Sequence, residues 1–390
     1  MPQESDGDIS LSARLSLLLV APLSGLAQIG MTPILPKISE HFTQVPNADA
    51  MVRLMVSGLS FAMIAGALMG GMAGDRFGRR RVLTWSLVMY AIAGFAGYFI
   101  DNLYLMIASR MVLGVANACA GIMVAAIFTT RINPSSREKW VGFLVVSGTL
   151  GAVLLLGIVG AVAKLDWRYV FALYLLSLPI ALLISTTLPK TPESLVPFSQ
   201  NRAAGEFPIG LTLFGIACGM VCTGYLSFVP FHLKHIGSGA PQWVAGVLMT
   251  SALSGAAVSF WYGWLRNRFA AVPVFMLGFA GCAAGLTTIA LATDYTGVIL
   301  GIAVVGGSVG LIGPTLFSAS AAAARPERRA RSIGFARAGM YAGPLVAQLP
   351  LEPLVRAAGA GAAILAVGGF SAMLIAVVSF NRRLFAPPGN

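Results

Sequence analysis

Apolar runs of about 20 residues recur along the whole chain and are separated by short polar connections. Each run is long enough to cross the ~30 Å hydrocarbon core of a bilayer as a helix, and a helix satisfies its own backbone hydrogen bonds in lipid. The pattern predicts an all-α polytopic membrane protein. The twelve predicted transmembrane spans are residues 13–35, 51–74, 82–100, 103–129, 140–163, 168–188, 209–232, 241–264, 271–292, 296–323, 333–351 and 358–381.

The longest polar connection, residues 189–208, contains four prolines and divides the spans into six plus six. A weak internal repeat supports this division, because "MVSGLS" from Met55 resembles "MTSALS" from Met249. Parallel repeats predict two pseudo-symmetric six-helix bundles around a central cavity. The predicted organisation is a tail (1–12), a bundle (13–188), a cytoplasmic linker (189–208), a second bundle (209–381) and a tail (382–390).

Charge is scarce and unevenly placed. Charged residues make up 10% of the 390 residues, the mean hydropathy is +0.82, and the net charge is +12. With both termini in the cytoplasm, 18 of the 26 Lys and Arg residues fall on the cytoplasmic side and six on the other. The positive-inside rule therefore accounts for the basic balance without a nucleic-acid partner. It predicts a multi-pass protein of the cytoplasmic (inner) membrane with both termini cytoplasmic.

Five charges are concentrated in "GGMAGDRFGRRR", between spans two and three. The stretch fits the spacing G-x-x-x-D-R-x-G-R-R with Gly71, Asp75, Arg76, Gly78, Arg79 and Arg80. This spacing resembles the signature loop of the major facilitator superfamily, and the six-plus-six layout extends the resemblance over the chain. "PILPKI" from Pro33 and "DWRYVF" from Asp166 are similar to the drug:proton antiporter (12-span) branch of that family.

The resemblance implies a conformational latch in this loop. Gly71 would leave space where two helices approach closely, and Gly78 would permit the tight turn. Asp75 would cap the start of span eleven, with Arg331 as a salt-bridge partner, and this contact would break as the halves move. A basic loop that only sets topology needs the arginines but has no need of Asp75 or the glycines.

Two arginines, Arg110 and Arg337, lie deeper within the predicted spans than any other. Arg110 and Gly114 match the family pattern R-x-x-Q-G in span four, where Leu113 replaces the glutamine. An arginine inside a span is costly, so Arg110 is a candidate substrate or coupling residue. It can instead bind backbone carbonyls or extend to the interface. Arg337, about five residues into span eleven, has the same two interpretations.

All fourteen acidic residues fall in predicted loops, tails or span ends, with Glu352 among the external ones. Exporters of lipophilic cations usually place a carboxylate inside an early span, so its absence favours neutral, zwitterionic or anionic substrates, for which the arginines could serve as partners. Further candidates for the cavity lining, which could equally bond between helices, are Gln28, Asn117, Tyr225, Tyr341 and Gln348.

Several glycines are expected to bring helices close together. Gly148 and Gly151 in span five keep part of the antiporter motif G-x-x-x-G-P-x-x-G-G but lack its proline. Span eleven carries the closer match, Gly339-x-x-x-Gly343-Pro344, in which the proline favours a bend. Neither version fixes the direction of transport.

A chain with these features can belong to one of three classes of function. The first is a secondary transporter of a small organic molecule working by alternating access, with proton-coupled efflux narrowly favoured. The second is an importer or uncoupled facilitator of an anionic or zwitterionic metabolite that uses Arg110 and Arg337. The third is a membrane enzyme or receptor-like scaffold, and the chain has no H-E-x-x-H, G-x-S-x-G or Walker motif to support an enzyme.

The predicted partners follow from the transporter interpretation: a small organic substrate, protons as coupling ion and the lipid bilayer. No cofactor is expected. Cys218 and Cys222 lie one helical turn apart, and His232 and His235 share a helix face, but both pairs are interpreted as structural, with no metal site. The resemblance implies a monomer.

Overall fold

The protein is entirely helical wherever its structure is described. The computed structural model describes residues 9–132, 134–189, 209–322 and 329–380, and every regular element among them is a helix. Ten stretches within these ranges are long and apolar enough to cross a membrane. One of them, 332–380, holds two helices that meet at Gly359, and the 18-residue helix α5 (Arg79–Ala96) lies outside the ten. This pattern agrees with the twelve predicted spans and confirms the all-α membrane fold.

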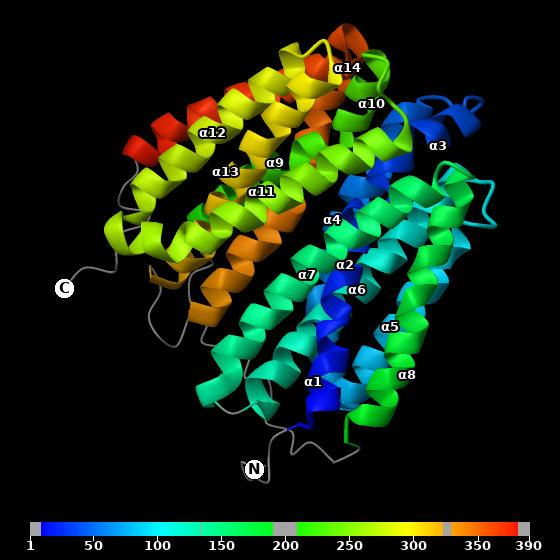
Figure 1. Ribbon diagram of the computed structural model, residues 1–390, viewed down its shortest axis with the longest axis vertical. Coiled ribbons are helices and arrows are strands. Elements are labelled where there is room, and N and C mark those ends of the chain that lie inside the picture. The colour runs from blue at the N-terminus through cyan, green and yellow to red at the C-terminus, as the bar shows by residue number, and fades with distance from the viewer. Residues whose placement is uncertain (1–8, 133, 190–208, 323–328, 381–390) are drawn as a thin grey trace. The chain divides into compact units, whose positions relative to one another are not determined.

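The chain divides into two compact units (Figure 1). Unit 1 comprises Met1–Met31 and Gly58–Gly205, and unit 2 comprises Thr32–Ser57 and Glu206–Asn390. The units differ from the predicted halves in residues 32–57, which precede the predicted linker but pack in unit 2. The predicted linker and C-terminal tail, apart from Pro189, and most of the N-terminal tail lie outside the described residues.

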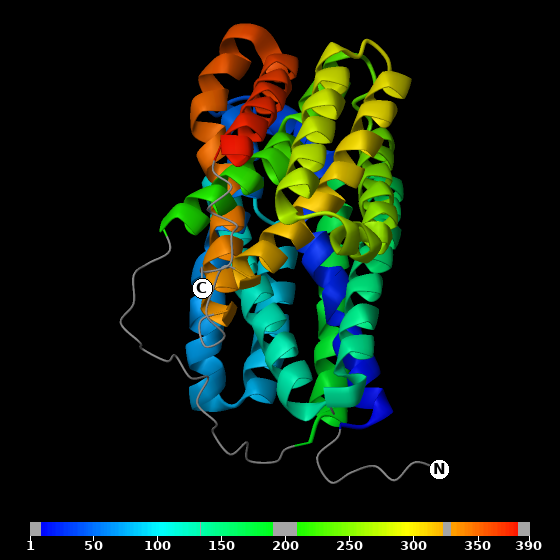
Figure 2. The same ribbon diagram turned by 90° about the vertical axis from the view of Figure 1, so that its left-hand side faces the viewer.

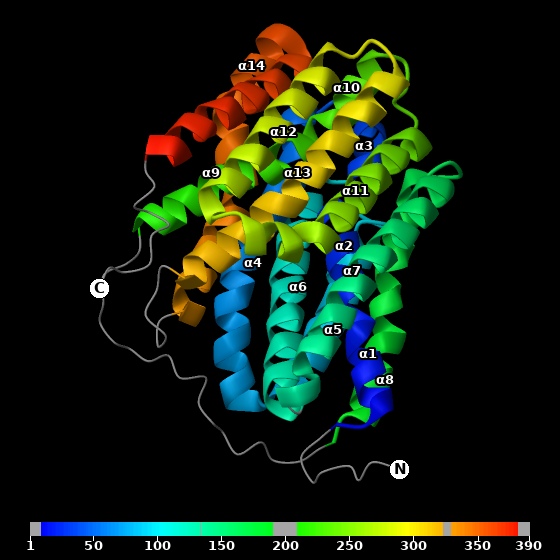
Figure 3. The same ribbon diagram turned by 60° about the vertical axis from the view of Figure 1, so that its left-hand side comes forward.

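Unit 1 is built from helices that each bury one face against two or more neighbours. Its elements are α1 (Leu11–Leu18), α2 (Val20–Ile29), the larger part of α4 (Ala48–Phe77), α5, α6 (Leu103–Arg131), α7 (Pro134–Val162), the 3₁₀ helix η2 (Trp167–Leu176) and α8 (Ser177–Thr187). Helix α5 packs against α6, α8 and η2, while α2 packs against α7 and α6. Helix α1 lies along α8, as Figure 3 shows.

Unit 2 is also built from packed helices. Its elements are η1 (Thr32–Ile34), α3 (Leu35–His41), the start of α4, α9 (Ile209–Thr223), η3 (Gly224–Ser227), α10 (Val229–His235), α11 (Pro241–Arg268), α12 (Ala271–Leu291), α13 (Tyr295–Ala322) and α14 (Arg329–Phe380). Helix α14 packs against α9 and α12, and α13 packs against α11 and α12.

Helix α14 contains the last two predicted spans. Its helical conformation is interrupted at Gly359, where φ is 82°. This left-handed conformation suits glycine, which has no Cβ to clash with the preceding turn. Figure 2 shows the two parts, orange and red, as an antiparallel hairpin. The hairpin therefore turns within a single residue, whereas the sequence predicted a six-residue connection.

The first helix of each predicted half is interrupted at a corresponding place. In the first half α2 gives way to η1 and α3, where Pro33 and Pro36 occur; in the second half α9 gives way to η3 and α10, where Pro230 occurs. Proline cannot donate the backbone hydrogen bond that a continuous helix requires. Paired interruptions of this kind are typical of transporter repeats and frequently border the binding site.

Glycines set the closest helix contacts in both units. In unit 1 a Cβ at Gly66 would overlap the Val115 carbonyl, and one at Gly70 would lie 2.9 Å from Cys119 Cα. Gly74 is similarly close to Met123, whereas a Cβ at Gly71 would meet no atom within 4 Å. The close approach expected at Gly71 therefore lies instead at the four-residue spacing Gly66, Gly70 and Gly74, where α4 meets α6.

The other glycines predicted to pack helices also lie against a neighbour. Gly114 faces Leu59 and Ala62 of α4, while Gly148 and Gly151 face Ala21 and Pro22 of α2. In unit 2, a Cβ at Gly343 would lie 2.5 Å from Gly219 Cα on α9, and Gly339 lies against the same helix.

Candidate functional site

The signature stretch forms the junction of α4 and α5 in unit 1, and most of it is helical. Helix α4 continues to Phe77 and α5 starts at Arg79, so Gly78 is the only residue between them, with φ 87°. Asp75 and Arg76 lie in the last turn of α4. The expected loop is thus one residue long, because a single glycine in a positive-φ conformation can reverse the chain.

The arginines of this junction bind other helices of unit 1. Arg79 Nη1 donates to the Ala126 carbonyl of α6 at 3.1 Å, and Arg80 donates to the Ser185 carbonyl in the last turn of α8. A cation at a helix C-terminus is stabilised by the helix dipole. The junction is therefore fastened to two further helices. The side chain of Arg331 lies outside the described residues, so the latch with Asp75 remains a prediction.

Arg110 is 1% exposed and lies within unit 1. Its guanidinium carbon is 5.1 Å from the ring centre of Phe171 and 4.7 Å from that of Tyr174, and its Nη2 donates to the Gly94 carbonyl at 3.0 Å. Among the residues that the structure describes, its Nε and Nη1 atoms have no hydrogen-bond partner. Two aromatic faces and one carbonyl therefore stabilise this cation. Its role toward substrate remains a prediction.

Two further candidates in unit 1 bond to helix α2. Asn117, which is buried, accepts a hydrogen bond from Ser24 Oγ at 2.9 Å. Gln28 is half-buried and donates to the Ser24 carbonyl at 3.2 Å. Both side chains thus have partners on α2, one turn before its interruption.

Three candidates of unit 2 are placed differently. Arg337 and Tyr341 lie one turn apart on α14, where Arg337 Nε donates to the Tyr341 hydroxyl at 3.2 Å. Arg337 is exposed and Tyr341 is half-buried, so this pair presents a cation next to an aromatic ring. Tyr225 lies in η3, at the interruption after α9, and is 1% exposed.

The start of α4 is joined to α14 by polar contacts within unit 2. Gln348, a predicted cavity residue, accepts a hydrogen bond from Ser57 Oγ and donates to the Ala50 carbonyl at 3.1 Å. One turn further along α14, Glu352 binds Arg53. Residues three or four apart share a helix face, so these groups form one line of contact. We call it the α4–α14 seam: Ala50, Arg53 and Ser57 with Gln348 and Glu352.

The Arg53–Glu352 ion pair is the strongest contact of the seam. Arg53 is 2% exposed, and its Nη2 lies 2.8 Å from Glu352 Oε1 and 2.9 Å from Oε2. The guanidinium also stacks on Phe228 and Phe231, with its carbon 5.8 Å and 4.9 Å from the two ring centres. Glu352 has a second cation nearby, Arg356 Nε at 3.6 Å on its own helix.

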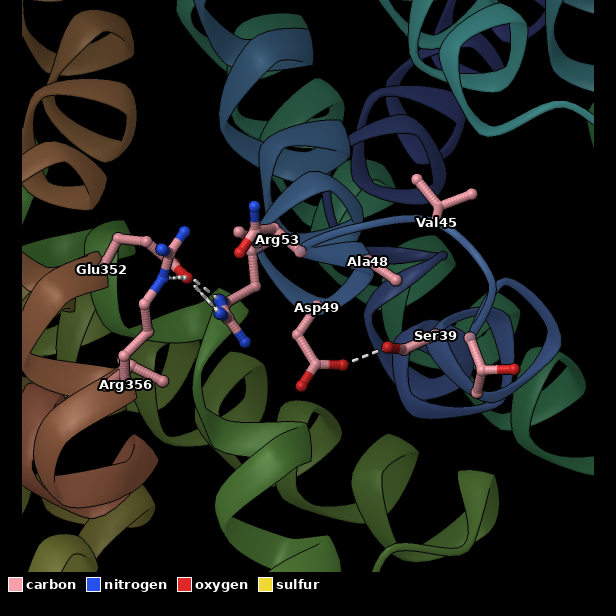
Figure 4. Close-up of a pocket in the computed structure, with 11 residues that line it drawn as sticks. Ser39, Val45, Ala48, Asp49, Arg53, Glu352 and Arg356 are labelled. Atoms are coloured by element: carbon pink, nitrogen blue, oxygen red, sulfur yellow. Dashed lines mark hydrogen bonds and ion pairs between the residues drawn. The ribbon is translucent and has the colours of Figure 1, made fainter.

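A pocket of about 420 Å³ opens beside this ion pair. Figure 4 shows Arg53 turned toward Glu352 and Asp49 turned toward Ser39, whose hydroxyl donates to it. The lining residues are Ser39, Thr43, Val45, Asn47, Ala48, Asp49, Ala50, Arg53, Glu352, Val355 and Arg356. The charge pattern predicts this end of unit 2 to be external.

The position of Glu352 corrects the sequence analysis. The span was predicted to end at 351, which left Glu352 in a loop, whereas α14 continues as a helix up to Gly359. Pro350 and Pro353 lie inside this helix, although proline usually breaks or bends a helix. Arg53, two residues inside span two, was the available signal for a buried pair, because a cation so placed needs an anion.

No metal centre is found among the described residues, which contain no group of three or more metal-ligating side chains. The four cysteines are buried and free. His232 is buried against Gly361 of α14, while His235 is exposed, so the two rings differ in environment.

The membrane-spanning helices of the described residues, with their paired interruptions, define a polytopic membrane protein of the transporter type. The Major Facilitator Superfamily model matches residues 17–348, and the chain belongs to that family. It is a multi-pass membrane protein that moves small organic molecules.

Similar proteins include several carriers of small organic metabolites. The 3-(3-hydroxy-phenyl)propionate transporter of Escherichia coli (strain K12) is 24% identical over 73% of this chain and 74% of its own length. The arabinose-proton symporter of the same organism is 24% identical over 44% of this chain and 36% of its own. A solved D-xylose-proton symporter has a TM-score of 0.79 at 16% identity, covering 94% of this chain and 96% of its own.

Proposed function

We propose that the protein is a proton-coupled importer of small organic anions, with aromatic carboxylates as the first class to test. The similarity to the hydroxyphenylpropionate transporter carries this proposal, because it extends over about three quarters of both chains. The name of the arabinose-proton symporter supports protons as the coupling ion. We further propose that both termini are cytoplasmic and that a monomer is the working unit.

The residues of this chain suit an anionic substrate. Arg337 presents an exposed cation beside the Tyr341 ring on α14, which is the chemistry that a planar aromatic carboxylate requires. In the sequence no carboxylate lies at the middle of a predicted span, where it would attract a cationic substrate. We assign a contact with the substrate carboxylate to Arg337, and a coupling role to the Asp75 latch with Arg331.

Proton-coupled efflux is the second candidate. It is favoured by the Gly339, Gly343 and Pro344 pattern of α14, which resembles the motif of the antiporter branch, and by "PILPKI" and "DWRYVF". The relatives named above include carriers described as symporters, and this weighs toward import.

The test uses the full chain reconstituted in liposomes that contain a pH-sensitive dye. We would add 3-(3-hydroxyphenyl)propionate outside, with its neutral alcohol and a lipophilic cation as comparisons. Import by symport predicts uptake of the labelled acid accompanied by internal acidification. Efflux by antiport predicts that an outward substrate gradient drives protons inward. Uptake without a pH change would identify a facilitator, and a response to the cation alone would contradict the anion class.

The same assay tests Arg337. We expect Arg337→Gln to raise KM for the acid about tenfold or more, since a charge-assisted hydrogen bond contributes ~1.5–3 kcal/mol. Arg268→Gln removes an exposed arginine in the last turn of α11, away from this site, and reports the effect of losing charge alone. Equal KM values for the wild type and Arg337→Gln would remove Arg337 from the site.

A further inference from the structure

Arg53 is a buried cation that depends on an anion. Its side chain is 2% exposed, and its carboxylate partner is Glu352. Removing one member of a buried pair leaves the other uncompensated, which is strongly unfavourable. If the α4–α14 seam opens during transport, Arg53 therefore requires a replacement anion.

Glu352 does not have the same requirement. Arg356 lies one turn further along α14, with its Nε 3.6 Å from Glu352 Oε1. Because this second cation is on the same helix, it stays with Glu352 whatever α4 does. If the two residues separate, Glu352 thus keeps a cation, Arg356, beside it. Arg53 would lose its carboxylate partner.

The pocket gives a solute access to Arg53. Its volume of about 420 Å³ is within the range of small-molecule sites. In Figure 4, two guanidinium nitrogens of Arg53 lie on the ion-pair lines, and the third points away from Glu352, on the side of Asp49. Asp49 is itself engaged by Ser39. Val45, Ala48 and Val355 add apolar surface for the hydrocarbon part of an organic acid.

We propose that Arg53 exchanges partners during transport: it binds Glu352 when the seam is closed and the carboxylate of an incoming organic anion when the seam opens, while Arg356 retains Glu352. This inference rests on the proposed function and adds a specificity-determining residue to it. A ligand shifts a conformational equilibrium only by its differential affinity for the two states. An anion that reaches Arg53 only after Glu352 has released it stabilises the open seam, and a neutral solute does not.

The proposal is tested by KM and kcat for uptake of 3-(3-hydroxyphenyl)propionate from outside, in four proteins. In Arg53→Gln the anion loses its partner, and we expect KM to rise about tenfold to a hundredfold. In Glu352→Gln the competing carboxylate is gone, and we expect KM to fall severalfold. In the double variant, Arg53→Gln with Glu352→Gln, we expect KM to stay as high as in Arg53→Gln.

The double variant distinguishes two causes of a higher KM in Arg53→Gln: loss of a contact with the substrate anion, and disturbance of the protein by an unpaired Glu352. If the Arg53→Gln defect only reflected an unpaired Glu352, removing that charge as well would restore the wild-type KM, and the proposal would be overturned. A rise of KM in Glu352→Gln would overturn it too. Arg53→Lys, which keeps the charge but loses the bidentate geometry, should fall between wild type and Arg53→Gln, and it serves if Arg53→Gln does not reach the membrane.

Lys234→Gln is the matched control. Lys234 also pairs with a carboxylate of this end of unit 2, Glu40 at 2.6 Å, but both side chains are about half exposed. An exposed pair contributes little, so KM should be unchanged. The outcome also distinguishes the two proposals: no uptake of any organic anion by the wild type would contradict the proposed function, whereas normal uptake with an unchanged KM in Arg53→Gln would contradict only the exchange.

Discussion

Arg53 and Arg110 are both at most 2% exposed, and the protein stabilises their charges by different means. Arg53 has a carboxylate held in bidentate contact, together with two phenylalanine rings. Arg110 has one carbonyl and two aromatic rings, and two of its nitrogens lack a hydrogen-bond partner in the described parts of the chain. The sequence indicated Arg110 as a buried cation but gave no sign of its rings, because Phe171 and Tyr174 come from a distant part of the chain.

The aromatic rings that stack on Arg110 predict that the stability of the protein depends on the planar shape of the guanidinium group. Lysine keeps the charge but cannot lie flat between two rings, so we expect Arg110→Lys to lower stability by about 1–2 kcal/mol. The measurement is the thermal midpoint of the purified protein in detergent. Tyr174→Phe keeps the ring and removes only the hydroxyl bonded to the Leu26 carbonyl, so a smaller loss is expected. A larger loss in Tyr174→Phe would mean that the hydroxyl, and not the stacking, supports this region.

Two glycines of α4, Gly66 and Gly71, are predicted to differ in how well they tolerate replacement by alanine. Gly71, five residues after Gly66, is the control. A methyl group at Gly66 would overlap the backbone of Val115, whereas one at Gly71 would meet no atom within 4 Å. We expect Gly66→Ala to destabilise the protein by about 1–3 kcal/mol through overpacking. Gly71→Ala should have little effect on the same thermal midpoint. The reverse order would show that the contact of α4 with α6 is not the one described.

At the scale of whole elements, the sequence predicted the existence of the helices better than their ends. Apolar periodicity locates a span, but a helix extends past its apolar part when polar side chains find partners. The last turn of α4 and the first turn of α5 are charged and helical because Gly78 alone makes the reversal. The predicted spans left Glu352 in a loop, yet α14 continues through it and accommodates both Pro350 and Pro353. Because Glu352 was placed in a loop, its ion pair with Arg53 was not predicted.

The chain reversal at Gly359 predicts that a side chain at this position lowers the stability of the protein through backbone strain alone. A Cβ there would meet no atom within 4 Å, but φ is 82°, which L-residues adopt with strain. We expect Gly359→Ala to lower stability by about 1–2 kcal/mol. Gly369→Ala is the control, since that residue has equally open surroundings inside the helix and alanine is the better helix former. Its thermal midpoint should be unchanged or higher.

For the whole molecule, the number of spans and the all-helical class followed from hydropathy. The division into units did not, because residues 32–57 precede the predicted linker and yet pack in unit 2. Their polar contacts, Arg53 with Glu352 and Ser57 with Gln348, join residues about 300 positions apart. Contacts over such separations leave no periodic signal in one sequence.

The latch is a prediction about the working cycle of the complete transporter. Asp75→Asn keeps the size of the side chain and removes its charge, so membrane insertion should be normal while the maximal uptake rate falls about tenfold. Initial rates in proteoliposomes, normalised to the amount of inserted protein, give the measurement. Arg76→Gln changes the neighbouring charge, which stacks on Phe77, and serves for comparison. Wild-type rates in Asp75→Asn would exclude the latch.

Helix α4 is continuous over 30 residues, from its seam residues Arg53 and Ser57 in unit 2 to its glycine face in unit 1. A helix turns ~100° per residue, so the angular phase between these two faces is fixed by the number of residues that separate them. One residue inserted after Gly58 would turn the face formed by Gly66, Gly70 and Gly74 by ~100° relative to Arg53 and Ser57 on the same helix. Evolution of this segment is therefore constrained in length as well as in residue type: substitutions can be absorbed one at a time, but a single-codon insertion or deletion puts the two ends of α4 out of phase.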